Sequence, residues 1–188
     1  MKSGRLLRSV PNILTLINMS LGLSAVLVLL QTDHPYKGFI APALICLGGV
    51  FDFFDGLLAR KLKAVSKMGK QLDSFADLIT FGVAPILLLN YTTSGKPSVI
   101  IIIASLAYIM TGAYRLARFN LDDFSEHFLG LPIPIAGIIL AVYGAIYPLW
   151  TIHTNPNICT AITKVLIIAL SIMMISKKKV KRVVPREH

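Results

Sequence analysis

Long apolar runs alternate with short polar segments along the whole chain. Six of these runs reach about 20 residues, the length that a helix needs to cross the hydrocarbon core of a bilayer. They cover about 11–31, 38–59, 72–92, 97–117, 132–152 and 157–176. The pattern predicts an all-α integral membrane protein with six transmembrane helices, built as a single domain over residues 1–188.

The chain begins with the basic segment MKSGRLLRSVPN. The apolar run that follows extends past Leu30, which is longer than the hydrophobic part of a secretory signal, and no cleavage site of the A-x-A kind comes after it. We therefore expect a short amphipathic segment that leads into the first span. Farther along, Pro85 predicts a kink in the third span, because proline lacks the N–H that a helix interior needs.

The composition supports a membrane protein. Of the 188 residues, 55% are hydrophobic and 15% are charged, and the mean hydropathy is +0.71. A soluble domain of this length is less apolar. The net charge of +10 would suggest nucleic acid as a partner, but the positions of the basic residues argue against nucleic acid and for the lipid bilayer.

The Lys and Arg residues gather on one side of the predicted spans. On the other side lie only three of the 19, namely Lys37, Lys96 and Lys164. By the positive-inside rule, both termini are cytoplasmic and the protein lies in the cell membrane. The basic tail is expected to rest on anionic lipid headgroups, or to act only as a stop-transfer charge cluster.

Four of the nine acidic residues lie within or against the second and third spans: Asp52, Asp55, Asp73 and Asp77. Residues three or four positions apart share one face of a helix, so each pair projects from one side of its span. The linker between these spans is short, which predicts an antiparallel hairpin with both pairs at nearly the same depth, near the cytoplasmic interface. The spacing therefore places four carboxylates in one small volume.

Four unpaired carboxylates would destabilise a membrane protein, so cations must offset their repulsion. Oxygen-only ligand sets suit hard divalent ions such as Mg²⁺ or Mn²⁺, and four carboxylates suit two such ions, as in phosphoryl-type displacement. Structural carboxylates paired with Arg60 and nearby lysines are the plainest alternative. A divalent-cation transporter is a second alternative, because carboxylates also line ion paths, and a non-catalytic scaffold is a third.

Residues 52 to 77 carry the motif D-x-x-D-G-x-x-A-R-x8-G-x-x-x-D-x-x-x-D. At every fixed position this motif resembles the signature of the CDP-alcohol phosphotransferase family. Those enzymes move a phosphatidyl or similar group from a cytidine diphosphate donor to an alcohol and release CMP. The resemblance implies a six-helix fold, a homodimer and an active site that faces the cytoplasm.

The resemblance also implies roles by position. Two divalent cations would bind to Asp52, Asp55, Asp73 and Asp77. Of these, Asp77 would also be the catalytic base that takes the proton of the acceptor hydroxyl.

Donor contacts are implied in both the first and second spans. Gly56 and Ala59 would accommodate the cytidine, and Arg60 would meet the donor phosphates. Gly69 would allow a close approach of the donor, although small residues such as Gly56 and Gly69 also serve simple span packing. The stretch PNILTLIN is similar to the family's P-N-x-x-T element, whose Asn12 and Thr15 would border the nucleotide or would merely cap a helix.

Three further stretches resemble the phosphatidylserine synthase branch of the family: DSFADLITFGVAP at 73–85, YRLARFN at 114–120 and GLPIP at 130–134. They imply CDP-diacylglycerol as the donor and L-serine as the acceptor. The candidate serine-binding residues are Ser74, Arg115, Arg118 and Asn120. An arginine can clamp a carboxylate, but both arginines can instead extend toward lipid headgroups. Glycerol 3-phosphate or an inositol phosphate would also need arginines, so serine is favoured by the resemblance and not by the residues themselves.

Overall fold

The computed structural model describes residues 2–31, 36–62, 64–93, 99–121, 128–176 and 179–180. Within this part the chain is helical except for its connections and one pair of two-residue strands. Six helical stretches are long and apolar enough to cross a membrane. The predicted fold class, all-α with six transmembrane helices, is therefore confirmed.

The helical elements follow one another closely along the chain. They are α1 (Lys2–Leu30), α2 (Lys37–Lys61), α3 (Lys67–Asp77), the π-helix η1 (Leu78–Val83), α4 (Ala84–Thr92), α5 (Val99–Leu121), α6 (Ile133–Thr151) and α7 (Pro156–Ile175). Since α3, η1 and α4 are continuous, they form one span from Lys67 to Thr92. The sequence predicts a kink at Pro85, and in the structure the π-helix η1 ends two residues before this proline.

Two helix starts lie earlier than the apolar pattern predicts. The third span begins at Lys67 because Ser66 caps it, with the Ser66 Oγ accepting a hydrogen bond from the Gly69 N–H at 3.0 Å. In α1 the helix runs without a break from Lys2 into the first span. The predicted amphipathic segment is therefore the start of α1, but the side chains of residues 2–8 lie outside the described part of the chain.

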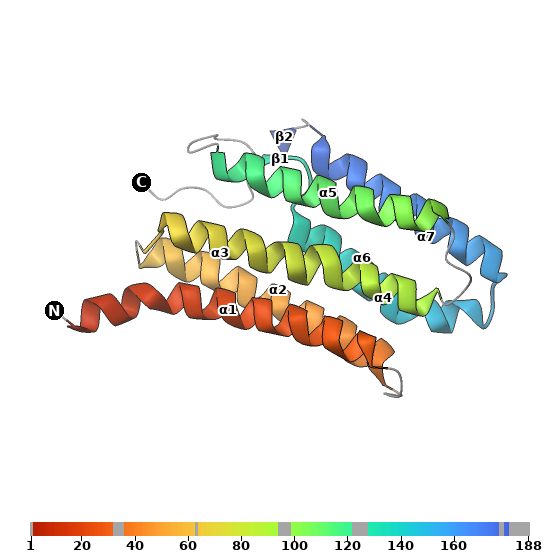
Figure 1. Ribbon diagram of the computed structural model, residues 1–188, viewed down its shortest axis with the longest axis horizontal. Helices are drawn as coiled ribbons and strands as arrows, with labels where there is room; N and C mark the ends of the chain where they lie inside the picture. The colour runs from red at the N-terminus through yellow and green to blue at the C-terminus, as the bar shows by residue number, and fades with distance from the viewer. Residues whose placement is uncertain are drawn as a thin grey trace.

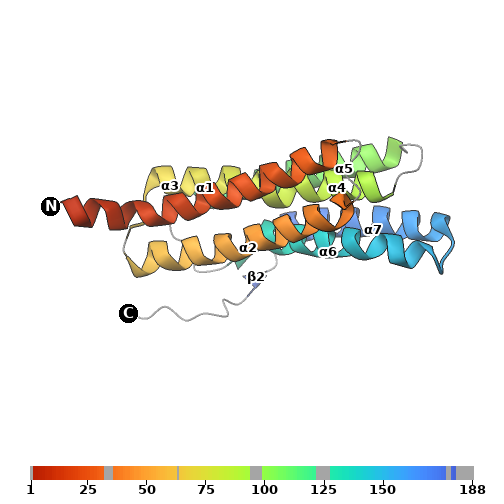
Figure 2. The same ribbon diagram turned by 90° about the horizontal axis from the view of Figure 1, so that it is seen from below.

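The third span occupies the middle of the bundle (Figure 1). It packs against α1 on one side and against α5 and α6 on the other, while α2 lies along α1 and α7 along α5. In its apolar window 56% of residues are buried, compared with 28% to 39% in the other spans. Figure 2, a view from below, shows the same helices running nearly parallel to one axis. Residues on the third span therefore contact most of the fold.

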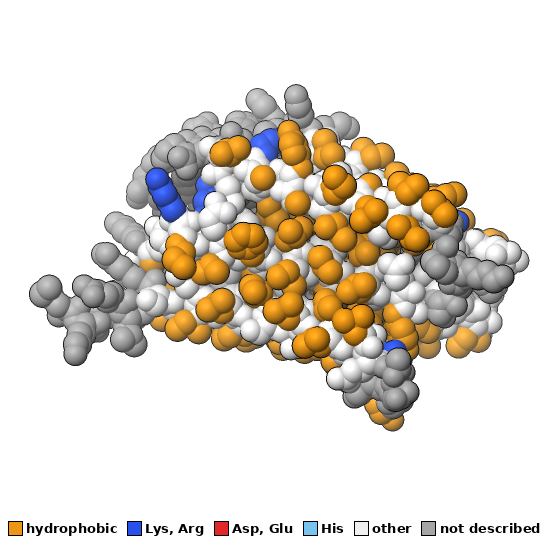
Figure 3. Space-filling view, viewed as in Figure 1, with side chains coloured by type: hydrophobic (Ala, Val, Ile, Leu, Met, Phe, Trp, Pro, Cys, Tyr) orange, Lys and Arg blue, Asp and Glu red, His pale blue; other side chains and the backbone are white. Residues whose placement is uncertain are grey.

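The outer face of the bundle is apolar. Figure 3 shows hydrophobic side chains spread along the length of the helices on one face. Large hydrophobic side chains that are exposed in the bundle include Leu27, Ile103 and Ile172. In a soluble protein such a surface would drive aggregation. In a bilayer it contacts lipid, as expected for a multi-pass membrane protein.

A short strand pair fastens the connection between α5 and α6 to the chain that follows α7. Strand β1 (Phe128–Leu129) pairs antiparallel with β2 (Lys179–Val180), and the Leu131 N–H donates to the Met173 carbonyl at 3.1 Å. Between them, Gly130 is buried and has a φ of 77°. The apolar pattern did not predict these strands, because two residues are too few for an alternation to be visible.

Replacing Gly130 with alanine should destabilise this connection. A Cβ at Gly130 would lie 3.0 Å from the Met173 carbonyl oxygen and closer still to that of Met174, and positive φ is strained for alanine. We expect the free energy of unfolding to fall by about 1–3 kcal/mol, measured as thermal unfolding in detergent. The control is Gly38→Ala, where a Cβ has no neighbour closer than 3.5 Å. Equal stability of the two variants would show that the connection accommodates a Cβ at Gly130 without strain.

Candidate active site

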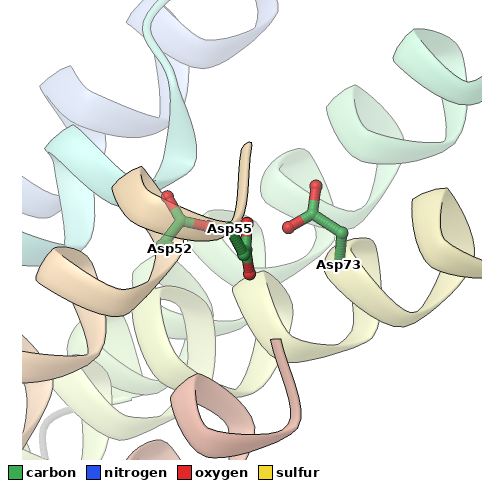
Figure 4. Close-up of side chains that lie close together, drawn as sticks. All are labelled: Asp52, Asp55 and Asp73. Carbon is green, nitrogen blue, oxygen red and sulfur yellow. The ribbon is translucent and has the colours of Figure 1, made fainter. Parts of the chain in front are cut away.

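The four aspartates lie in the hairpin that α2 and α3 form, near the end of the bundle where these two helices are joined. Figure 4 shows Asp52 and Asp55 on α2 approaching Asp73 on α3. One carboxylate oxygen of each of these three residues lies within 4.8 Å of the other two. From one turn farther along the third span, Asp77 adjoins Asp52. Three of the four predicted carboxylates thus form a close group, and the fourth lies beside it.

A cavity of about 400 Å³ opens over this carboxylate group. Its walls come from residues 11–15 of α1, from α3, from the connection between α2 and α3, from the start of α6 and from the last turns of α2 and α5. A volume of this size is typical of small-molecule sites. The cavity therefore joins all the sequence motifs, although they lie far apart along the chain.

Most predicted site residues line this cavity. They are Asn12, Thr15, Asp52, Asp55, Gly56, Ala59, Arg60, Gly69, Asp73, Ser74, Asp77 and Arg115. The other two, Arg118 and Asn120, are half-buried in α5 and do not belong to the lining. Asn120 still contacts it indirectly, because its Nδ2 donates to the Ser74 Oγ at 2.9 Å.

On the α1 side of the cavity, Gly69 of α3 faces the side chain of Asn12. A Cβ at Gly69 would lie 2.8 Å from the Asn12 Oδ1, so a larger residue there would displace the Asn12 side chain. Thr15 is buried, its hydroxyl donates to the Pro11 carbonyl at 3.0 Å, and its side chain also contacts the Asp55 carboxylate. Gly56 is different, because no atom lies within 4 Å of the position that a Cβ would occupy. The missing side chain at Gly56 therefore leaves open space inside the cavity.

The α5 side of the cavity combines cationic and polar groups. The Arg115 Nε is buried without a hydrogen-bond partner, as is the Asn120 Oδ1. Lys70 lines the cavity as well, with its Nζ 3.4 Å from the Asn120 carbonyl oxygen and 5.4 Å from the centre of the Phe119 ring. Lys70 is one of several lysines near the connection between the second and third spans. Its place inside the motif, directly after Gly69 and three residues before Asp73, was the signal that could have singled it out.

The carboxylate group fits a hard divalent cation. Asp55 and Asp77 are 4% and 6% exposed, and the Asp55 Oδ2 and the Asp77 Oδ1 have no hydrogen-bond partner. Arg60, the expected partner in the structural alternative, directs its Nε instead to the Gly56 carbonyl at 3.0 Å. Buried carboxylate oxygens without donors are costly, and a bound cation would offset that cost. The three grouped aspartates are therefore able to hold a metal ion.

Comparison with known proteins agrees with this geometry. Residues 8–176 match the family model of CDP-alcohol phosphatidyltransferase. A Bacillus subtilis protein named CDP-diacylglycerol–serine O-phosphatidyltransferase is 39% identical over 172 residues, which cover 90% of this chain and 88% of that protein. A Methanocaldococcus jannaschii protein with the same name is 36% identical over 140 residues, covering 74% of this chain and 62% of that protein.

A third relative is the archaetidylserine synthase of Methanothermobacter thermautotrophicus, which is 34% identical over 138 residues. These residues cover 72% of this chain and 57% of that protein. The chain thus spans less than two thirds of the length of both archaeal relatives. The matched family consists of enzymes, which favours catalysis over the cation-transport and scaffold alternatives. Because the family model covers most of the six-span fold and the whole carboxylate motif, the chain belongs to the CDP-alcohol phosphatidyltransferase family.

Proposed function

We propose that this protein transfers the phosphatidyl group from CDP-diacylglycerol to L-serine and releases CMP. The observation that carries the proposal is the approach of the Asp52, Asp55 and Asp73 carboxylates inside a cavity large enough for a nucleotide headgroup. The name of the Bacillus subtilis relative supports serine as the acceptor. Glycerol 3-phosphate and an inositol phosphate remain the alternatives that the residues alone do not exclude.

The donor is assigned to the α1 and α2 side of the cavity. Gly56 and Ala59 would accept the cytidine, with Asn12, Thr15 and Gly69 at its border, and Arg60 would contact the phosphates. Phe53 lines the cavity although it is 61% exposed, so the cavity wall continues onto the apolar outer surface. Such continuity suits a lipid donor whose acyl chains stay in the bilayer.

Asp77 is the group assigned to the acceptor proton. Its Oδ1 is buried without a hydrogen-bond partner and is available to receive the proton of the serine hydroxyl. The serine oxygen then bonds to the phosphorus that carries diacylglycerol, and the bond from this phosphorus to the bridging oxygen breaks. CMP leaves with that oxygen and its electron pair. Two divalent cations, Mg²⁺ or Mn²⁺, held by the four aspartates would neutralise charge on the diphosphate and on the departing CMP.

The serine is assigned to the α5 side of the cavity. Arg115 would pair with its carboxylate through the guanidinium, and Ser74, held by Asn120, would donate or accept a further hydrogen bond. We also assign Arg118 to the serine, as a residue that contacts it when the substrate is bound.

The proposal also places the protein in its membrane. The start of α1 and the connection from α2 to α3 lie at the same end of the bundle, and α7 runs back toward that end (Figure 1). By the positive-inside rule, the basic residues of that end face the cytoplasm. The protein then lies in the cell membrane with its active site and both termini on the cytoplasmic side. We also propose a homodimer, which the mass of the detergent-solubilised protein measured by light scattering would test.

Replacing Arg115 with lysine should separate the acceptor from the donor. Lysine keeps the charge but loses the planar pair of donors, so the KM for serine should rise by roughly 10-fold while the KM for CDP-diacylglycerol stays the same. The matched control is Arg118→Lys, outside the cavity lining, where a smaller rise is expected. Equal increases in both KM values for Arg115→Lys would mean that this residue serves the donor phosphates or the fold.

The proposed function is tested by CMP release from the purified protein. With CDP-diacylglycerol and Mn²⁺ or Mg²⁺, CMP should appear when L-serine is added and should not appear in the presence of a chelator. CMP release with glycerol 3-phosphate but not with serine would keep the chemistry and change the acceptor. If folded protein released no CMP with serine, glycerol 3-phosphate or an inositol phosphate, the proposal would be wrong.

A further inference from the structure

The third span widens directly after Asp77. Residues Leu78–Val83 form the π-helix η1, whose first turn therefore carries the chain away from the proposed catalytic base. A π-helix has poorer backbone geometry than an α-helix and persists only where its surroundings hold it. Four features hold this segment: two hydrogen bonds from hydroxyl groups, and two glycines that let neighbouring helices pack closely against it.

Two hydroxyl groups bond the wide turn to the helices beside it. The Thr80 Oγ1 donates to the Asn18 carbonyl of α1 at 3.1 Å, and the Tyr108 Oη of α5 donates to the Phe81 carbonyl at 3.0 Å. Pro85 has no N–H to offer the Phe81 carbonyl four residues before it, and the Tyr108 hydroxyl donates to this carbonyl instead of the missing α-helical donor. Thr80, Phe81 and Tyr108 are all 0% exposed.

Two glycines let the neighbouring backbones press on the same turn. A Cβ at Gly22 of α1 would lie 2.7 Å from the Thr80 Cα, and a Cβ at Gly137 of α6 would lie 2.6 Å from the Phe81 Cα. Real side chains do not fit at these distances. The wide turn is therefore held between α1 and α6 while α5 bonds to it.

The position of Asp77 depends on this turn. Its Oδ1 has no hydrogen-bond partner, and the side chain that the Asp77 carboxylate adjoins, Asp52, is itself a proposed metal ligand, so the backbone of the third span must bring Asp77 to this place. Thr80 lies one helical turn farther along. We propose that Thr80 and Tyr108 are positioning residues, whose hydroxyl bonds fix the wide turn after Asp77 and thereby hold Asp73 and Asp77 against the aspartates of α2. This inference rests on the proposed metal-dependent function.

The test compares two variants that lose a hydroxyl group with one variant that keeps it. Thr80→Val removes the hydroxyl, Thr80→Ser keeps it, and Tyr108→Phe removes the tyrosine hydroxyl with the ring retained. For Thr80→Val and Tyr108→Phe, Mn²⁺ binding in the absence of substrates, measured by electron paramagnetic resonance, should weaken by roughly 10-fold, with a similar fall in kcat. Both KM values should change by less than about twofold, and Thr80→Ser should behave like wild type, because its hydroxyl still holds the turn.

The matched control is Thr163→Val in α7. Thr163 is equally buried and donates to the Cys159 carbonyl at 2.9 Å, but it lies in α7 and not in the span that carries Asp73 and Asp77. This variant should lower thermal stability while leaving the Mn²⁺ affinity unchanged. Wild-type Mn²⁺ affinity and kcat in Thr80→Val would overturn the inference, as would a Thr80→Ser variant as impaired as Thr80→Val. Failure of the wild-type protein itself to bind Mn²⁺ would instead overturn the proposed metal site, and this inference with it.

Discussion

Replacing Asp52 with asparagine is expected to abolish CMP release and Mn²⁺ binding while the protein stays folded. Asparagine keeps the shape of the side chain but removes its charge, so the carboxylate group loses one anionic ligand of the three that lie within 4.8 Å. Charge neutralisation at a transferring phosphoryl group is worth several kcal/mol, so kcat should fall by roughly 10³-fold or more. Asp73→Asn, from the opposite helix, should have the same effect.

The stability of the metal-free protein separates this explanation from unfolding. Like charges at short distance repel, so removing one of them should leave the thermal unfolding temperature in a chelator unchanged or higher. The control is Glu187→Gln, which removes the same charge near the end of the chain, outside the described residues. That variant should keep full activity. If Asp52→Asn retained more than about a tenth of the activity, the metal account could not be maintained, since a ligand loss costs more than this.

Much of the fold could be predicted from the sequence because the bilayer imposes a simple rule on the chain. A span must be about 20 residues long and apolar, so its presence is visible in composition alone. Helix ends are less visible, because they depend on local contacts. The start at Lys67, for example, depends on the Ser66 cap, and the extension of α5 to Leu121 includes polar residues beyond the apolar run.

The carboxylate group was predictable for a different reason. Helical periodicity and a short linker together fix which residues of α2 and α3 meet, without knowledge of the other spans. Contacts between distant spans were not predictable in this way. The contribution of Lys70 to the cavity and the bond between Asn120 and Ser74 depend on how α5 packs against α3, which no local pattern encodes.

The π-helix η1 illustrates the same limit. Pro85 predicts a kink in the third span, but the π-helix beside it depends on Tyr108, Gly22 and Gly137, which lie in three other spans. Each of these residues is unremarkable in its own segment. Their common role becomes visible only when the helices are packed.

Gly56 gives the second large expected effect, because its missing side chain leaves open space beside the aspartates. Replacing it with leucine would place four carbon atoms in a cavity of about 400 Å³, where no protein atom lies within 4 Å of the new Cβ. Protein stability should not fall, since glycine is the weaker helix former by about 1 kcal/mol. The kcat/KM for CDP-diacylglycerol should nevertheless fall by roughly 100-fold, because a clash with the donor costs about 1–3 kcal/mol.

A graded series makes this prediction specific to the donor. Gly56→Ala should lie between wild type and Gly56→Leu in kcat/KM, because one carbon fills less of the cavity than four, and all three proteins should bind Mn²⁺ equally. The control is Gly38→Leu, at the far end of the same helix, where the nearest atom to a Cβ is the Tyr91 ring at 3.5 Å and the cavity is not reached. That control should keep wild-type activity. If Gly56→Leu kept its kcat/KM for the donor, the nucleotide would have to bind elsewhere; if it lost Mn²⁺ binding instead, Gly56 would serve the carboxylates and not the donor.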